Sequence, residues 1–336
     1  MLVYTARRFA VAIPVLLAAS VLVFLMVDLS GDPLSDLRMQ QPPPSPETIA
    51  AAEARYYLDR SIPERYWLWM TGIGGNGDIG LLQGKFGPSV RGGPFDIGEQ
   101  LASGISITIR LVSAAIVMAL GLAIVSGVIS AMRQYSKLDY TLTFIGFLAL
   151  AMPTFWLGAL IREGGLWFNK TTDTSFFYTI GANSARVSNM TGWEYFLDSA
   201  GHLVLPTVTL MLTSYAAWSR YQRTSMLEVL NSDYVRLARA KGVRNSVVVR
   251  RHALRTALIP LVTVATIGIV GILEGVVIIE TIFQWRGLGY FFIEAVKAKD
   301  TFALMAWLML SGTLVVLANL IADVLYGVLD PRIRYE

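Results

Sequence analysis

The sequence predicts an all-α, multi-pass membrane protein, and three observations support this prediction. Hydrophobic residues make up 54% of the chain and charged residues only 15%, whereas soluble domains average about 25% charged residues. The mean hydropathy is +0.53. The apolar residues also gather in long runs, of the length that a helix needs to cross a bilayer. Because the chain has no cysteine, it cannot build a disulfide framework or a thiolate metal site.

Six apolar segments are expected to cross the membrane as helices. The first runs from Phe9 to Val27, and we interpret it as a retained span, because a cleaved signal peptide, the alternative, usually has a shorter apolar core. The others follow in chain order: residues 105–132, 138–161, 203–218, 257–283 and 302–329. Pro153 in the third span and Pro206 in the fourth are expected to kink their helices.

The chain is therefore expected to have three parts. Residues 1–30 form the cytoplasmic end and the first span, residues 31–103 form a long external loop, and residues 104–336 form a membrane domain with a cytoplasmic region at 219–256. Within the external loop, residues 47–70 predict one or two amphipathic helices. Gly72, Gly74 and Gly77 spell GxGxxG, but no strand precedes them and no helix follows. A dinucleotide site is therefore rejected, and a flexible exposed loop is expected.

Positive charge predicts the orientation of the spans. Residues 219–256 hold nine Lys or Arg and only two acidic residues, and further cations lie at the C-terminus and in the turn after the second span. Cytoplasmic loops carry such an excess, so both termini and this basic region are expected inside the cell. Residues 31–103 are then external.

Inside the basic region, one short helix stands out. Asp233 is expected to cap it and Gly242 to end it, and small residues in it would permit close approach of a partner. The candidate site comprises Asp233, Tyr234, Arg236, Leu237, Ala238, Ala240, Lys241 and Gly242. From charge alone, two interpretations remain open: a docking surface for another protein, or a solvated anchor on lipid headgroups.

This region resembles the coupling motif of permease subunits in binding-protein-dependent ABC importers, E-A-A-x-x-x-G followed by a Leu-Pro-like start of the next span. Here the residues are Arg236-Leu237-Ala238-x-x-x-Gly242, with Ile259-Pro260 after a spacer of 17 residues. The arginine replaces the usual glutamate, and the spacer is longer than in the sugar importers. Six other phrases resemble the dipeptide and oligopeptide branch of this family: GDPLSDL, SKLDYTLTF, MPTFWLG, HLVLPTVTL, ETIFQWRGLG and LDPRIRYE.

The resemblance implies the type I ABC importer permease architecture and a set of partners. These are a homologous second permease, two ATP-binding subunits and an external solute-binding protein, with peptides as the expected substrate and membrane lipid around the spans. ATP and Mg²⁺ would bind the partner subunits, because the nearest P-loop candidate, at Gly84-Lys85, lacks the first glycine and the hydroxyl residue that the motif requires. No cofactor, enzymatic activity or nucleic acid is expected for this chain. The cargo remains open, because nickel, glutathione and other small solutes also occur in this branch.

Three further expectations concern individual features. Glu274 lies among glycines within the fifth span, where it would either line the pathway and hold a peptide amino group or serve as a buried link between helices. The Gly-rich tip, residues 72–93, would either help release solute from a docked binding protein or be merely mobile. His202 and His252 lie far apart, so a shared metal site is not expected. A secondary transporter and an intramembrane enzyme remain the alternative classes.

Overall fold

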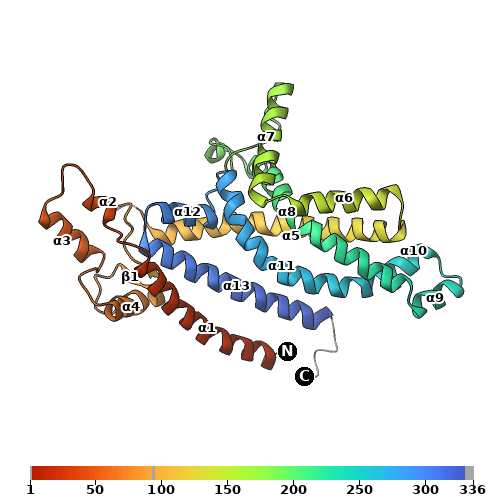
Figure 1. Ribbon diagram of the computed structural model, residues 1–336, viewed down its shortest axis with the longest axis horizontal. Coiled ribbons are helices and arrows are strands. Elements are labelled where there is room, and N and C mark those ends of the chain that lie inside the picture. Colours follow the sequence, from red (N-terminus) through yellow and green to blue (C-terminus); the bar gives the residue numbers. More distant parts are fainter. Residues whose placement is uncertain (1, 93–94, 330–336) are drawn as a thin grey trace. The chain divides into compact units, whose positions relative to one another are not determined.

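The computed structural model describes residues 2–92 and 95–329, except for the side chains of residues 2–9, 188, 267, 270, 273, 274 and 321–329. Almost all of the regular structure is helical (Figure 1). By its internal contacts the chain forms two compact units. Of the described residues, unit 1 contains 107–286 and 318–329, and unit 2 contains 2–106 (without 93 and 94) and 287–317. The predicted all-α fold class is confirmed.

Unit 1 is built around one long helix, α8, which packs against α6, α7 and α11. A capping box begins α8, because the side chains and backbones of Thr191 and Glu194 satisfy one another's hydrogen-bonding groups. The helical elements of this unit, including α5, which starts in unit 2, are α5 (Ile97–Met132), α6 (Lys137–Ala151), α7 (Thr154–Thr172), a 3-10 turn (Val187–Asn189), α8 (Gly192–Leu230), α9 (Asp233–Ala240), α10 (Asn245–Val247), a π-helix (Val248–Ala253) and α11 (Leu254–Ile282).

The third predicted span is not one continuous helix. Met152 leaves the helical conformation and Pro153 begins the next helix, so α6 and α7 meet at an angle of 111°. The physical reason is the proline, which cannot donate the next helical hydrogen bond and disfavours a helical conformation in the residue before it. By contrast, α8 passes through Pro206 without interruption.

The core of unit 1 is an apolar cluster contributed by α5, α8 and α11. Leu111, Leu210, Leu261 and Ile279 lie at its centre with almost no exposed surface. Helices α5 and α8 approach closely at Gly127, where an added Cβ atom would lie only 2.8 Å from the Cβ of Gln222. A side chain at this position would force the two helices apart.

Unit 2 contains α1 (Leu2–Leu29), α2 (Ser35–Arg38), α3 (Pro46–Arg55), α4 (Ile62–Thr71), α12 (Leu288–Lys297) and the first part of α13 (Thr301–Leu329). The amphipathic stretch in the external loop thus forms two helices, α3 and α4. The sequence predicted either one or two helices there. The Gly-rich segment carries structure that the sequence did not predict, a two-stranded antiparallel hairpin formed by β1 (Ile79–Gly80) and β2 (Lys85–Phe86) around the 3-10 turn Leu81–Gln83.

Several helices have the length and apolar composition of membrane spans. Within the described residues, four meet this test, in α1, α5, α8 and α13, and a fifth is obtained if the bent α6–α7 pair crosses as one span. Helix α11 covers the fifth predicted span, at 257–283. The predicted count of six spans is therefore not established by these helices, although each predicted segment is helical.

Candidate functional site

The predicted short helix is present as α9. Ser232 occupies its N-cap position and Asp233 is its first residue, so the prediction that Asp233 caps the helix is wrong by one position. The helix ends as predicted at Gly242, whose φ of +74° lies in the left-handed region. The amide of Gly242 donates to the carbonyl of Arg239 at 2.9 Å, and the amide of Val243 donates to that of Ala238 at 3.3 Å.

Val235 is the fully buried side chain that holds α9 to the rest of unit 1, and the half-buried Ala238 packs against the same cluster. Val235 is fully buried and packs in an apolar cluster with Met226 of α8 and with Val248 and Val249 of the π-helix. Sequence reasoning missed Val235, because a single valine gives no periodic apolar pattern in an eight-residue helix. Figure 1 shows α9 and α10 at the end of this unit where α8 ends and α11 begins.

Almost all of the predicted site residues lie on the exposed side of α9. Tyr234 is 44% exposed and Leu237 is 56% exposed, which are large values for such apolar side chains. Ala238 is half-buried. The other predicted residues are exposed: Asp233, Arg236, Ala240, Lys241 and Gly242. Arg239, which was not among the predicted site residues, is also exposed. The surface thus places Tyr234 and Leu237 among charged side chains that are cationic except for Asp233.

An ion pair close to this helix was not predicted. Arg223 of α8 reaches Asp139 of α6 with two parallel hydrogen bonds, from Nε to Oδ1 and from a terminal guanidinium nitrogen to Oδ2, both at 2.8 Å. The hydroxyl of Ser130 also donates to Oδ1 of Asp139, and the amide of Tyr135 donates to Oδ2 at 2.9 Å. The two charges are 84 positions apart in the chain, so no local pattern in the sequence predicts their contact.

Of the two carboxylate residues in α11, the structure describes the side chain of Glu280 but not that of Glu274. Glu274 lies in α11, but its side chain is outside the part of the chain that the structure describes. Glu280, nearer the end of the same helix, is fully buried and accepts a hydrogen bond of 2.5 Å from the hydroxyl of Thr108. It therefore ties α11 to α5.

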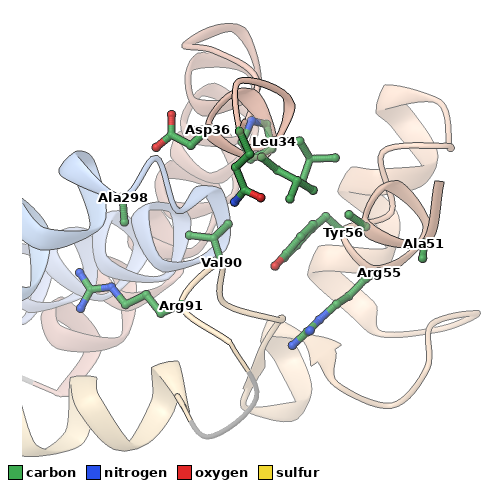
Figure 2. A pocket seen from close by; sticks show the side chains of 12 residues that line it. Leu34, Asp36, Ala51, Arg55, Tyr56, Val90, Arg91 and Ala298 are labelled. Carbon is green, nitrogen blue, oxygen red and sulfur yellow. The ribbon is translucent and has the colours of Figure 1, made fainter. Parts of the chain in front are cut away.

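Unit 2 has a hollow of about 530 Å³ between α2, α3 and the segment after the hairpin. Figure 2 shows Tyr56 and Arg55 on one wall, with Val90 and Arg91 across from them. The guanidinium group of Arg91 lies 4.9 Å from the ring centre of Phe95 and 3.8 Å from Glu294. The hollow is mixed in character, because apolar side chains, the cations Arg55 and Arg91 and the carboxylate of Asp36 all line it.

The Gly-rich tip is folded rather than merely an open loop over residues 72–92. Ile79 is buried, and the hydroxyl of Tyr57 donates to Asp78 at 2.7 Å while accepting from the amide of Asn76 at 3.0 Å. Gly80 passes so close to Gly72 that an added Cβ would lie 2.9 Å from its Cα atom. These contacts fix the hairpin against the end of α4.

The two histidines are separated, as expected. His202 is buried in α8, where its Nδ1 lies 2.8 Å from the carbonyl oxygen of Asp198 and its ring stacks on that of Tyr178. His252 is exposed in the π-helix. Over the described part of the chain, no three His, Asp or Glu side chains are grouped as metal ligands.

The sequence is similar over nearly its whole length to characterised permease proteins. It is 35% identical to the oligopeptide transport system permease protein OppB of Mycobacterium tuberculosis (strain H37Rv), with 98% of each chain covered. It is 35% identical to the oligopeptide transport system permease protein AppB of Bacillus subtilis (strain 168) and 31% identical to the dipeptide transport system permease protein DppB of Escherichia coli (strain K12), both over the full length of each chain.

A family profile agrees with these relatives. Residues 123–335 match the family described as binding-protein-dependent transport system inner membrane component. That match contains α9, the ion pair of Asp139 with Arg223, and both α8 and α11. With its apolar helices and its full-length relatives, the chain is a multi-pass protein of the bacterial inner membrane that belongs to the binding-protein-dependent transport system inner membrane components, a family of transport permeases rather than enzymes.

Proposed function

We propose that this chain is one permease subunit of an ATP-driven peptide importer. The observation that carries the proposal is α9, an eight-residue helix attached through Val235 and the half-buried Ala238. Its other residues are exposed, with Tyr234 and Leu237 among charged side chains that are cationic except for Asp233. Such a surface suits a protein partner better than water, because apolar area is left uncovered. The names of the relatives, oligopeptide and dipeptide transport permeases, support the choice of cargo.

In this proposal the energy comes from partner subunits. A homologous second permease would complete the pathway, and two ATP-binding subunits, one of them docked on α9, would carry both ATP and Mg²⁺. Closure of the ATP-binding subunits would displace α9 and, through it, the ends of α8 and α11. An external solute-binding protein would deliver the peptide. The hollow beside Arg55 and Tyr56 is a candidate contact for that protein, because it combines apolar side chains with charged groups of both signs.

The proposed topology has six spans and both termini in the cytoplasm. The spans would be α1, α5, the α6–α7 pair, α8, α11 and α13. The main support is the cationic region after α8, which together with α9, α10 and the π-helix would lie inside the cell. Residues 31–103 would then be external, and the folded hairpin at their tip would be available to a docked binding protein.

Glu274 is the proposed pathway residue. A carboxylate within an apolar helix is costly unless it is paired or in contact with water, and a peptide amino group offers the complementary charge. The alternative, a link between helices like that made by Glu280, remains open. Replacement of Glu274 by Gln keeps the size of the side chain but removes the charge, so it separates the two roles through transport and assembly.

The proposed function is tested by purification of the chain from its native host in mild detergent. The wild-type chain is expected to bring with it ATP-binding subunits and ATP hydrolysis that rises with binding protein and peptide. Gly242→Pro should abolish docking or stimulation, because the proline ring cannot adopt the φ of +74° at this position.

A matched control is available in the external loop. Gly84 has a φ of +73°, open space around its Cα atom and an amide that donates within its own turn, all as at Gly242. Gly84→Pro therefore imposes the same local conflict far from α9 in the sequence, and co-purification should survive it. Recovery of the chain alone, with transport that needs no ATP, would contradict the proposed function.

A further inference from the structure

The buried ion pair of unit 1 joins three helices at one point. Asp139 comes from the first turn of α6, Arg223 from α8, and Ser130 from the last turn of α5. Arg223 donates from Nε to the hydroxyl oxygen of Ser130 at 3.0 Å as well as to the carboxylate. Its parallel pair of bonds to Asp139 fixes direction as well as distance. A shift of α8 along α5 or α6 therefore breaks several bonds together.

The carboxylate of Asp139 is fully engaged at this position. Only 2% of the residue is exposed, and its two oxygens accept from Arg223, Ser130 and the amide of Tyr135. A buried charge that loses its partner carries a large penalty, so the three helices are held in register rather than loosely associated. The side chain of Arg223 is 26% exposed, which leaves this end of the pair near the surface of the unit.

The pair lies one helical turn from the attachment of α9. Arg223 precedes Met226 by three positions on α8, and residues three apart lie on neighbouring parts of a helix surface. Met226 is fully buried in the cluster that contains Val235 of α9 and Ala131 at the end of α5. A displacement of α9 thus reaches α8 at Met226, and the ion pair is the next connection from α8 to α6.

A second contact restricts the same segment of α8. Gln222, beside Arg223, is fully buried and lies against Gly127 of α5, where the helices approach too closely for a side chain. The close approach prevents α8 from moving toward α5, and the ion pair prevents it from sliding or separating. Together they make the ends of α5, α6 and α8 one rigid body near α9.

We infer that the Asp139–Arg223 pair, with Ser130, is the positioning element that makes α5, α6 and α8 move together when α9 is displaced, and that it sets how tightly ATP hydrolysis is coupled to transport. This inference rests on the proposed function. It assigns to these three residues no contact with peptide or ATP. Their role is to transmit motion, so their loss should separate the two activities rather than abolish either one.

The test measures ATP hydrolysed per peptide transported. The complete transporter is reconstituted in liposomes with its binding protein, and Asp139→Asn and Arg223→Lys are compared with wild type. Arg223→Lys keeps the charge but loses the parallel pair of bonds. Both variants are expected to raise the ATP-to-peptide ratio at least threefold while ATP hydrolysis itself persists. Ser130→Ala, which keeps the ion pair, should raise the ratio less.

A matched control and the contrary outcomes distinguish the possibilities. Arg220→Lys changes a cation one turn away on α8 that lies over the ring of Phe147, 4.7 Å from its centre, and it should leave the ratio unchanged. If Asp139→Asn and Arg223→Lys reduce only the amount or melting temperature of the complex and the ratio stays at the wild-type value, the inference is wrong although the proposed function stands. If the wild-type complex transports without ATP hydrolysis, both are wrong.

Discussion

The burial of Val235, the one fully buried residue of α9, leads to a prediction of defined size. Val235→Ala removes two methyl groups from a fully buried position, and burial of a methylene contributes about 0.8 kcal/mol, so about 1.6 kcal/mol is lost. Incomplete collapse of the space around Met226, Val248 and Val249 raises the loss to about 2–3 kcal/mol. Because 1.4 kcal/mol is a factor of ten, a loss of this size should make α9 detach roughly 30-fold to 140-fold more often.

Hydrogen–deuterium exchange measures this local opening directly. The amides of residues 236–243, which donate within α9 and its terminal turn, should exchange faster in Val235→Ala by that factor, while amides in the middle of α8 should not change. Leu237→Ala is the matched control, because this side chain is 56% exposed and removal of it leaves no cavity. Equal protection of α9 in Val235→Ala and wild type would refute the view that Val235 holds the helix.

Four further predictions follow from single positions. Gly127→Ala should lower the melting temperature of the purified chain, because the added Cβ atom would lie 2.8 Å from the Cβ of Gln222. The control Gly121→Ala should leave the melting temperature unchanged, because an added Cβ atom there has nothing within 4 Å. Equal melting temperatures of the two variants would contradict the close approach of α5 and α8. Leu237→Ala, if α9 docks through its exposed side, should weaken co-purification of the ATP-binding subunits without faster exchange in α9, and undiminished co-purification would count against docking there. Burial raises the pKa of Asp300 above its ordinary value, so the stability of the folded protein should be greatest at a pH below the ordinary pKa and should fall as the pH rises through the raised pKa. In thermal melts over this pH range, Asp300→Asn should lose less stability than wild type. An equal loss in both proteins would remove Asp300 as the cause. Glu274→Gln should reduce peptide uptake without loss of assembly, and unchanged uptake would exclude the pathway role.

The helical architecture was largely predictable because it depends on local properties. Runs of apolar residues identify helices of spanning length, and Gly242 marks the end of α9 through its need for a left-handed conformation. The break between α6 and α7 was harder to predict from the sequence. A proline at position 153 indicates a kink, but the angle of 111° depends on what the two helices pack against.

Only the exposed residues of the candidate site on α9 could be predicted from the sequence. The exposed residues of α9 were recognised through a sequence motif and charge, whereas Val235 is a single apolar residue whose burial depends on Met226 and on the π-helix. The pairing of Asp139 with Arg223 depends on how α6 and α8 pack. Contacts between residues far apart in the chain leave no periodic pattern in one sequence, and a buried ion pair is such a contact.

The π-helix at Val248–Ala253 gives the start of α11 a spare residue. A π-turn holds one residue more than an α-turn in nearly the same length, so its conversion to α-helix would advance the following residues by about 1.5 Å and turn them by about 100° around the axis. The segment follows α9 and α10 directly and contributes Val248 and Val249 to the cluster that holds α9. A pull on α9 would thus reach α11 as a rotation, which alters the side chains that the helix presents along its length without unfolding any turn.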